Sequence, residues 1–537
     1  MKKILLINLK GHHEIISSTH LINAIIYQAP DTQISLLIYQ EFNSSAAILN
    51  NVHKIYTIDR AAITALHKKL IYSKAFAYDA FFDALGPAYE ESWDEIINFS
   101  NDKVSSYLSS FFLKDNHTKI HGTYFDKTGQ LQYSSNWLML LSDLMPQLPS
   151  LPIHFQNIFL QTIGRKENNS INGIAIDETN NEIAYLKFGK IRKQLANQKD
   201  NAKLIGIPCN FARPAVMKNV LQLLLNTSFT HPVLLATCQT EKEKAHLLNR
   251  HFTGQLIIIE DDFKSLPSTL LNLDLLLSTE GPIKYLADLL EIPAIEVITD
   301  YKHAFQQQTT LKGNLILTAT SHQISDSVFH LNLLETLRFF FNLTTTPTIS
   351  TEECLYIVER DSLGITYKRI IDSADLNFNH LFYLMARHLL GLILLNRRTI
   401  DSFFAITDKT SAQTAKWHQE EMQAVLMLSK KILSTLKSLR KVDGGAPSTS
   451  AFVSALDKLL DESDNGAHLV AFPALFFKMR LETLTANSTM TNLKNIEQLL
   501  YLFKKEIKII IEALTELEEA ISNKTNPSNN YFPNLNL

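Results

Sequence analysis

The stretch LDLLLSTEGPIKYLADLLEIPAIEVI, residues 273–298, combines the features that bind phosphate groups in α/β proteins. An apolar run at 273–277 predicts a strand, Gly281 and Pro282 predict a turn, and the residues that follow predict a helix and a second strand. A helix that begins after such a turn directs unpaired backbone N–H groups and the positive end of its dipole outward, which favours a phosphate or diphosphate. A β–α–β crossover that binds nothing has the same pattern, because this unit is the commonest one in α/β proteins.

The elements around this turn decide whether it lies at a ligand-binding edge, since ligands of open α/β sheets collect beyond the carboxyl ends of the strands. Residues 1 to about 160 alternate apolar runs with helix-like segments. This alternation predicts a parallel sheet with helices on both faces, and therefore one doubly wound domain. The predicted strands are KILLINL, QISLLIY, HKIYTID and YDAFFDALG, and the first predicted helix is SSTHLINAIIYQA.

A second alternating region follows a polar stretch at 164–201, which reads as a linker. Its predicted strands are KLIGIPC, PVLLATC, QLIIIED, the strand of the opening stretch and NLILTAT, with helices at 215–225 and 241–251. Two Rossmann-like halves of similar size resemble the GT-B architecture, in which substrates bind in the cleft between the domains.

The pattern changes after about residue 345. A linker-like run, TTTPTIST, precedes a predicted hairpin at 354–372 with its turn at 361–364, and helical patterns continue to about residue 522. The last helix carries two apolar heptad positions that form a coiled-coil-like seam. Another helix offers a matching apolar stripe, so the seam predicts either packing within a helical bundle or a dimer contact. The first seam consists of Leu493, Leu500, Ile507, Leu514 and Ile521 with Ile496, Phe503, Ile510 and Leu517, and the matching stripe of Val425, Leu428, Ile432, Leu439 and Val442.

Composition excludes several classes of protein. The 537 residues carry a formal net charge of -3 with scattered lysines and arginines, which argues against a nucleic-acid partner. The three cysteines share no disulfide or metal spacing, so we expect a reducing compartment and no metal. The apolar run after Met1 is too short for a signal peptide. Residues 381–395 contain Arg387 and His388 and fall short of a bilayer span, which favours a buried helix and a soluble, cytoplasmic protein.

Several stretches, taken in order, resemble glycosyltransferase family 9, the ADP-heptose:lipopolysaccharide heptosyltransferases and their relatives. The resemblance covers roughly residues 1–320 and rests on the stretches KILLINLKGHHEIISSTHLINAI, HKIYTIDR, YDAFFDALG, KLIGIPCNFARP, HPVLLATCQTEKEKAHLL and LDLLLSTEGPIKYLADLLEIPAIEVI. It implies a GT-B-like fold and an inverting glycosyltransferase. It also implies a nucleotide-diphosphate sugar donor, typically ADP-heptose, an acceptor glycan of the lipopolysaccharide type, and no further cofactor.

The resemblance assigns the catalytic base to the first loop. When Thr19 and His20 are aligned with the family's Thr-Pro pair, His13 and Glu14 stand where the family has Gly-Asp. Glu14 then supplies the carboxylate that takes the acceptor's proton, and His13 tunes that carboxylate or acts as the base itself. The alternative is a polar loop without a catalytic role.

The donor site is assigned in the same way. Gly281 and Pro282 match the family's signature, Asp-Ser/Thr-Gly-Pro-x-His-x-x-Ala, and Lys284 stands at its histidine. Arg213 lies where the family carries a basic residue and could clamp the diphosphate with its fork of donors. The signature's Asp-Ser/Thr pair is replaced. In an alignment without a gap, Thr279 stands at the Asp and Glu280 at the Ser/Thr. In the other alignment, Glu280 is the acidic residue and the hydroxyl is lost.

With the resemblance, the sequence predicts an acceptor domain and a nucleotide-sugar domain, followed by the hairpin with its helical extension and a disordered tail. The altered motifs leave a second hypothesis, a degenerate glycosyltransferase scaffold that binds a protein partner or another copy through its C-terminal helices. An enzyme of this class would lie in the cytoplasm or at the inner face of the inner membrane. The predicted segments are 1–165, 166–345, 346–522 and 523–537.

Overall fold

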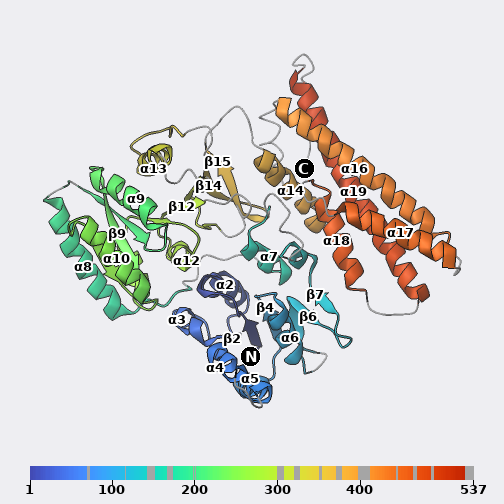
Figure 1. Cartoon of the computed structure of the whole chain (residues 1–537), viewed down its shortest axis with the longest axis horizontal. Coiled ribbons are helices and arrows are strands. Elements are labelled where there is room, and N and C mark those ends of the chain that lie inside the picture. Colours follow the sequence, from blue (N-terminus) through green and yellow to red (C-terminus); the bar gives the residue numbers. More distant parts are fainter. Residues whose placement is uncertain are drawn as a thin grey trace. The chain divides into compact units, whose positions relative to one another are not determined.

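The structure is a computed structural model of the whole chain, in which two compact units form (Figure 1). One unit holds residues 1–126, 154–360 and 364–371, and the other holds 127–153, 361–363 and 372–537. The residues described below are 1–68, 73–114, 117–141, 152–165, 173–197, 199, 201–298, 308–319, 327–349, 354–370, 378–396, 412–442, 446–463, 468–484 and 489–525.

The first unit begins with a five-stranded parallel sheet in the order β3-β2-β1-β4-β5. Three of its strands have the predicted sequences, because their uninterrupted apolar runs are buried on both faces. The fourth, EIIN, was not predicted, since it has only four residues. The strands are β1 (Lys3–Ile7), β2 (Gln33–Tyr39), β3 (Lys54–Ile58), β4 (Glu95–Asn98) and β5 (Lys119–His121), and the short β6 (Thr123–Phe125) and β7 (Leu131–Tyr133) follow.

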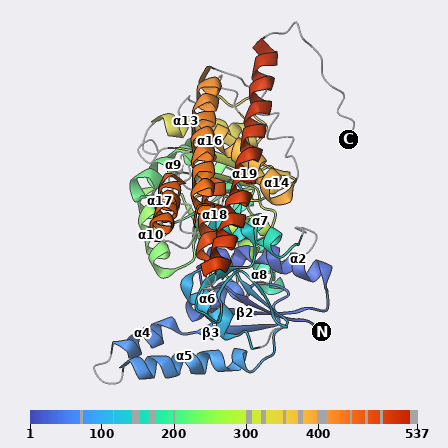
Figure 2. The same cartoon turned by 90° about the vertical axis from the view of Figure 1, so that its right-hand side faces the viewer.

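The strand predicted from YDAFFDALG is wrong, because this segment lies within the helix α5 (Ser73–Tyr89). Its buried residues, Ala77, Leu85 and Ala88, recur at helical spacing, whereas Tyr78 and Phe82 face solvent. Helix α5 lies beside α4 (Arg60–His67) (Figure 2). The other helices of this part are α1 (His12–Ser17), α2 (Thr19–Gln28), η1 (Gln40–Phe42), α3 (Asn43–Ala46), α6 (Lys103–Phe111) and α7 (Phe155–Thr162).

The second sheet of this unit has eight strands in the order β10-β9-β8-β11-β12-β13-β14-β15. Its first five strands repeat the order of the first sheet, so both halves are Rossmann-like, as the sequence predicts. The core consists of residues from the strands and covering helices, including Ile205, Leu234 and Leu277. The parallel strands are β8 (Lys203–Pro208), β9 (Thr230–Ala236), β10 (Ile257–Glu260), β11 (Leu275–Ser278), β12 (Ala294–Ile298) and β13 (Leu315–Thr318).

Two features of this half differ from the sequence prediction. The polar stretch read as a linker contains the 19-residue helix α8 (Glu178–Ala196), which starts at the capping residue Asp177. The predicted hairpin is confirmed as β14 (Cys354–Asp361) and β15 (Gly364–Arg369), but β14 pairs antiparallel with β13 and so extends the second sheet. The helices are α9 (Pro214–Asn226), α10 (Gln239–His251), α11 (Leu266–Leu270), α12 (Pro282–Leu289) and α13 (Ser327–Phe340).

The other unit is mainly helical. Helices α16 (Ala412–Leu439) and α19 (Thr489–Thr525) lie side by side in Figures 1 and 2, and the heptad residues Leu500, Ile507 and Leu514 are buried within this chain. The seam therefore packs within a helical bundle, the first of the two predicted alternatives. Residues 523–525 of the predicted disordered tail are helical, since α19 continues to Thr525, and the residues from 526 lie outside the described part. The elements are η2 (Asn136–Leu141), α14 (Phe378–Leu395), α16 (Ala412–Leu439), α17 (Ala446–Ser463), α18 (Ala471–Glu482) and α19 (Thr489–Thr525).

Helix α14 is the buried helix predicted at 381–395. Its Arg387 is fully buried because the guanidinium forms a fork with the carboxylate of Asp361, with a distance of 2.7 Å from Nε to Oδ2. One further guanidinium nitrogen donates to the carbonyl of Pro152. Within the described ranges, no helix combines the length and the apolar character that a membrane crossing requires.

Candidate active site

The first candidate loop lies where the strand order of the first sheet reverses, between β1 and β4. The chain passes from β1 to β2 on one side, while β4 pairs with the other side of β1. Loops beyond the carboxyl ends of such a pair are the usual ligand-binding position in open α/β sheets. The loop after β1 leads directly into α1, whose first three residues are His12, His13 and Glu14.

The carboxylate of Glu14 is fixed by two contacts. Its Oε2 accepts the backbone N–H of Gly11 at 2.8 Å, and its Oε1 lies 3.0 Å from Nε2 of His13. Burial raises the pKa of Glu14, but the hydrogen bond and charge of His13, together with the Gly11 N–H, bring this pKa below its ordinary value. The His13 side chain is 29% exposed and that of Glu14 only 11%, so His13 is the more accessible member of the pair.

His12 has a different environment. Its Nδ1 lies 2.5 Å from the hydroxyl of Ser45, and its ring stacks on Phe263 with centroids 4.9 Å apart. Burial, with a smaller effect of the neighbouring His13, lowers the pKa of His12. The His12 ring on α1 of the first half therefore packs against the segment after β10 of the second half.

The second candidate loop lies at the corresponding position of the second sheet, where β8 and β11 are neighbours. The loop after β8 contains Phe211 and Arg213, and the loop after β11 contains Thr279 and Glu280. The Thr279 hydroxyl donates to the carbonyl of Phe211 at 3.5 Å, so the two loops lie side by side. Glu280 is exposed.

Arg213 is exposed and forms the N-cap position of α9 without a capping side chain. The adjacent carbonyl, that of Ala212, accepts a hydrogen bond of 3.0 Å from Nζ of Lys244 on α10. This bond fixes the backbone of the loop beside Arg213. Sequence analysis did not single out Lys244, because nothing in its local pattern distinguishes it from the other polar residues of α10.

The turn before α12 is open. A Cβ atom built on Gly281 would meet no heavy atom within 4 Å, and Gly281 is the N-cap residue of α12 with Pro282 at its first position. Proline is well suited to this position because the first helical N–H has no partner within the helix. The backbone N–H groups that follow are those a phosphate oxygen would meet at such a helix start.

Lys284 does not reach this opening. Its side chain is 0% exposed, its ammonium lies 3.2 Å from Oε1 of Glu296 on β12, and it lies 4.0 Å from the ring centroid of Tyr285. Glu296 also accepts the backbone N–H of Thr309 at 2.6 Å. Burial is the main effect that raises the pKa of Glu296, to about 7, although Lys284 opposes it. The ammonium thus holds α12 to β12.

A second buried carboxylate fixes the other end of α12. Asp288 accepts hydrogen bonds from the Thr309 hydroxyl at 2.5 Å, from the Thr310 backbone N–H at 2.7 Å and from Asn314 Nδ2 at 3.0 Å. Burial raises the pKa of Asp288, and Lys284 and Thr309 oppose this effect. Buried polar groups with this many partners hold their helix in one position, so the start of α12 is rigidly placed.

The two candidate loops lie close together within this unit. The ring of His13 is nearly parallel to that of Tyr285 on α12, with centroids 6.1 Å apart. The structure thus brings His13 and Glu14 beside α12, whose turn contains Gly281 and Pro282, and Thr279 links this turn to the loop of Arg213. Of the predicted site residues, Lys284 is fully enclosed and Glu14 is also buried. Tyr285 and Phe263 were missed, since buried aromatic residues near a loop carry no distinctive sequence signal.

The comparisons with known proteins concern the fold. A glycosyltransferase family 9 protein from Veillonella parvula is 13% identical, with a TM-score of 0.41 over 62% of this chain and 89% of that chain. An E. coli heptosyltransferase with ADP-2-deoxy-2-fluoro heptose is 13% identical, with a TM-score of 0.42 over 64% of this chain and 100% of the other. The likeness is one of fold alone.

The same fold likeness extends to another class of enzyme. A UDP-GlcNAc 2-epimerase from Neisseria meningitidis bound to UDP-GlcNAc is 12% identical, with a TM-score of 0.32 over 64% of this chain and 94% of that chain. No family model matches the sequence, and no curated protein sequence matches it.

Proposed function

We propose that this protein transfers a sugar from a nucleotide-diphosphate donor to an acceptor hydroxyl, with inversion at the anomeric carbon. The observation that carries the proposal is the placement of the His13–Glu14 pair beside α12, with each candidate loop at the switch point of its own sheet. A base and a diphosphate-binding turn that lie close together, each at the ligand-binding edge of its own sheet, are what a group transfer between two substrates requires.

The first half supplies the base. The acceptor hydroxyl loses its proton to the His13–Glu14 pair as its oxygen attacks the anomeric carbon, and the bond from that carbon to the diphosphate oxygen breaks. We assign proton acceptance to His13 Nδ1, because its Nε2 already faces Glu14 Oε1 at 3.0 Å, or to Glu14 Oε1 itself. The lowered pKa of Glu14 keeps its carboxylate ionised at neutral pH, so it orients and stabilises a protonated His13.

The second half supplies the diphosphate site. We propose that Arg213 forms its fork of hydrogen bonds with the phosphates, while the open backbone after Gly281 contributes neutral donors. The Thr279 hydroxyl adds one more when it turns from the Phe211 carbonyl to the ligand. Lys284 acts at a distance by holding α12 in place, because its ammonium is buried against Glu296. The exposed carboxylate of Glu280 opposes the diphosphate charge and weakens donor binding.

The proposed donor is a heptose-like nucleotide sugar, with ADP-heptose as the first to test, and the proposed acceptor is a glycan of the lipopolysaccharide type. Both assignments rest on the resemblance of the ordered motifs to glycosyltransferase family 9.

The experiment measures release of nucleotide diphosphate from a panel of nucleotide sugars, with and without acceptor glycans. Glu14→Gln is the decisive variant, because Gln keeps the shape of the side chain and can still accept from Gly11. We expect turnover to fall by about 100-fold or more while donor affinity in calorimetry stays the same. Glu90→Gln, an exposed position of the same half, is the matched control. Undiminished turnover of Glu14→Gln would refute the assignment of the base.

One observation favours a second candidate function, a glycosyltransferase-like scaffold that binds a partner without catalysis. The donor turn has an exposed acidic residue, Glu280, and the nearby cation of Lys284 is enclosed. Calorimetry on the full chain separates the two functions. An absence of affinity for every nucleotide diphosphate and nucleotide sugar tested would support the scaffold and exclude the transferase.

A further inference from the structure

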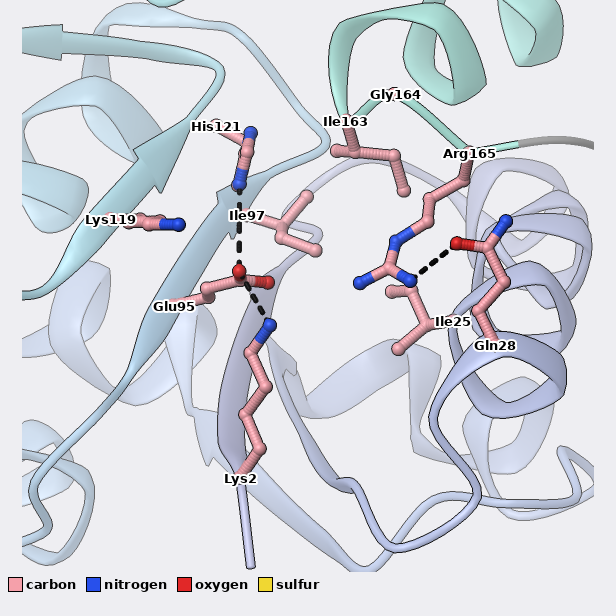
Figure 3. Close-up of a pocket in the computed structure, with 10 residues that line it drawn as sticks. All are labelled: Lys2, Ile25, Gln28, Glu95, Ile97, Lys119, His121, Ile163, Gly164 and Arg165. Atoms are coloured by element: carbon pink, nitrogen blue, oxygen red, sulfur yellow. Dashed lines mark hydrogen bonds and ion pairs between the residues drawn. The ribbon is translucent and has the colours of Figure 1, made fainter.

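A pocket of about 380 Å³ opens at the end of the first sheet where its strands begin (Figure 3). Lys2 precedes β1, Glu95 begins β4 and Lys119 begins β5, so the pocket lies at the amino-terminal edge of the strands. The candidate active site lies beyond their carboxyl ends. Asn8 lies six positions after Lys2, which corresponds to about 20 Å of extended strand. The pocket is therefore a different place from the proposed transfer site.

One carboxylate serves two basic side chains in this pocket. Oε1 of Glu95 lies 2.6 Å from the Lys2 ammonium and 4.0 Å from Nε2 of His121, and both contacts are drawn in Figure 3. Burial opposes ionisation of Glu95, but His121 and Lys2 outweigh it and lower the pKa of this carboxyl to about 2. Glu95 is thus a fixed anion whose charge is already compensated.

Two further basic side chains, those of Lys119 and Arg165, line the pocket and form no ion pair within the described residues. In the described part of the chain, neither Lys119 nor Arg165 lies within ion-pair distance of an acidic side chain, and Nη1 of Arg165 donates to the neutral Oε1 of Gln28 at 2.5 Å. Figure 3 shows the guanidinium of Arg165 directed across the pocket toward Glu95 and Lys2. Three fully charged cations against one carboxylate leave the lining with an excess of positive charge.

The remaining lining is partly apolar. Ile25 comes from α2, Ile97 from β4 and Ile163 follows α7. Figure 3 shows Ile97 between the Glu95 cluster and Arg165, with Ile25 and Ile163 beside the Arg165 side chain. A concave site with an apolar wall and a few charged groups is the usual form of a small-molecule site. A guanidinium fork and a lysine ammonium together match the oxygens of a phosphate group.

We propose that this pocket binds the phosphate group of a small organic phosphate monoester, with Arg165 and Lys119 on the phosphate and the isoleucine side chains against the organic part. The ligand is distinct from the sugar donor, since the site lies at the opposite edge of the sheet. The proposal does not depend on the proposed glycosyl transfer.

The test is calorimetry of the full chain with two probes, phenyl phosphate and inorganic phosphate, at matched ionic strength. We expect phenyl phosphate to bind more tightly than inorganic phosphate, because only the ester contacts the isoleucine side chains. Arg165→Gln and Lys119→Gln should each weaken the ester about tenfold, since each removes a hydrogen bond to a charged group. The control variant, Lys68→Gln with Lys103→Gln, removes two exposed lysines of the same half and should leave affinity unchanged.

Three results would overturn the proposal. They are an absence of phenyl phosphate binding, equal affinities for the two probes, and an equal loss of affinity in the control variant. The variants change partly or fully exposed side chains, so circular dichroism and thermal unfolding are expected to show an intact fold, and an unfolded variant would be replaced by Arg165→Lys. Arg165→Lys keeps the positive charge but lacks the fork of N–H donors, so its affinity for phenyl phosphate should lie between those of the unchanged protein and Arg165→Gln.

Discussion

Replacement of Lys284 by Met should destabilise the second half of the first unit. The sequence predicts this lysine at the diphosphate of the donor, but in the structure it pairs with Glu296. The ammonium is 0% exposed and lies 3.2 Å from the Glu296 carboxylate, which corresponds to about 5 kcal/mol at an effective dielectric constant of about 20. Removal of one partner from a buried ion pair typically costs about 3–5 kcal/mol, because the other charge stays buried alone. For a domain of this size we expect the melting temperature to fall by roughly 6–20 °C.

The rescue variant makes this prediction specific. Lys284→Met combined with Glu296→Gln removes both charges, so it should recover most of the stability that the single variant loses. Thermal unfolding by circular dichroism measures the loss, and hydrogen exchange should localise it to peptides from α12 and β12. Lys193→Met, an exposed position on α8, is the control. A fall of less than about 2 °C in the single variant, or no rescue in the double, would refute the structural role of the pair.

Glu296 also gives this half a pH dependence with a defined sign. Its pKa in the folded protein is about 7, above the ordinary 4.5, so the folded state binds this proton more tightly than the unfolded chain. The resulting stabilisation is complete below about pH 4.5 and is lost as the pH rises to 7, with a total on the order of 3 kcal/mol. Glu296→Gln should remove this part of the pH profile, and stability measured between pH 5 and 8 checks it.

Three further predictions concern other sites. Glu14→Gln should reduce turnover by about 100-fold or more without changing donor affinity, as measured by release of nucleotide diphosphate. Glu280→Gln should tighten donor binding several-fold in calorimetry, because it removes an exposed anion beside the proposed diphosphate site; weaker binding would contradict this placement. Arg387→Met should cost the helical unit about 3–5 kcal/mol through the buried Asp361 carboxylate, and Asp361→Asn in the same chain should restore part of it; thermal unfolding decides both outcomes.

The strands were the most predictable part of the fold. The run QISLLIY became β2 with the same limits, because a strand buried on both faces must be apolar throughout. YDAFFDALG failed for a related reason. Its aromatic residues favour a strand by composition, but the burial of Ala77, Leu85 and Ala88 follows the helical period. Tyr78 and Phe82 lie on the exposed side of this helix, so the apolar pattern of the sequence carries no clear helical period.

The site was predictable in its loops and less so in its side chains. A Gly-Pro turn after an apolar strand has one plausible position in a parallel sheet, so the placement of Gly281 followed from the pattern. The environment of Lys284 did not, since its partner Glu296 lies on the next strand. A signal was nevertheless present. Glu296 interrupts the otherwise apolar strand AIEVI, and a carboxylate inside such a strand requires a partner of opposite charge.

The hairpin at β14 and β15 changes how the role of the C-terminal helices has to be tested. The composition shift after residue 345 predicts a domain boundary there, and on that prediction truncation near 350 removes only the helical extension. In the structure, β14 pairs with β13 along the second sheet, and Cys354 exchanges backbone and hydroxyl hydrogen bonds with Thr318. Truncation at 350 would expose the edge of β13 and the apolar residues beneath β14, so loss of nucleotide binding in that variant would report damage to the sheet. A truncation that separates the helices from the donor site has to begin after Arg369, where β15 ends.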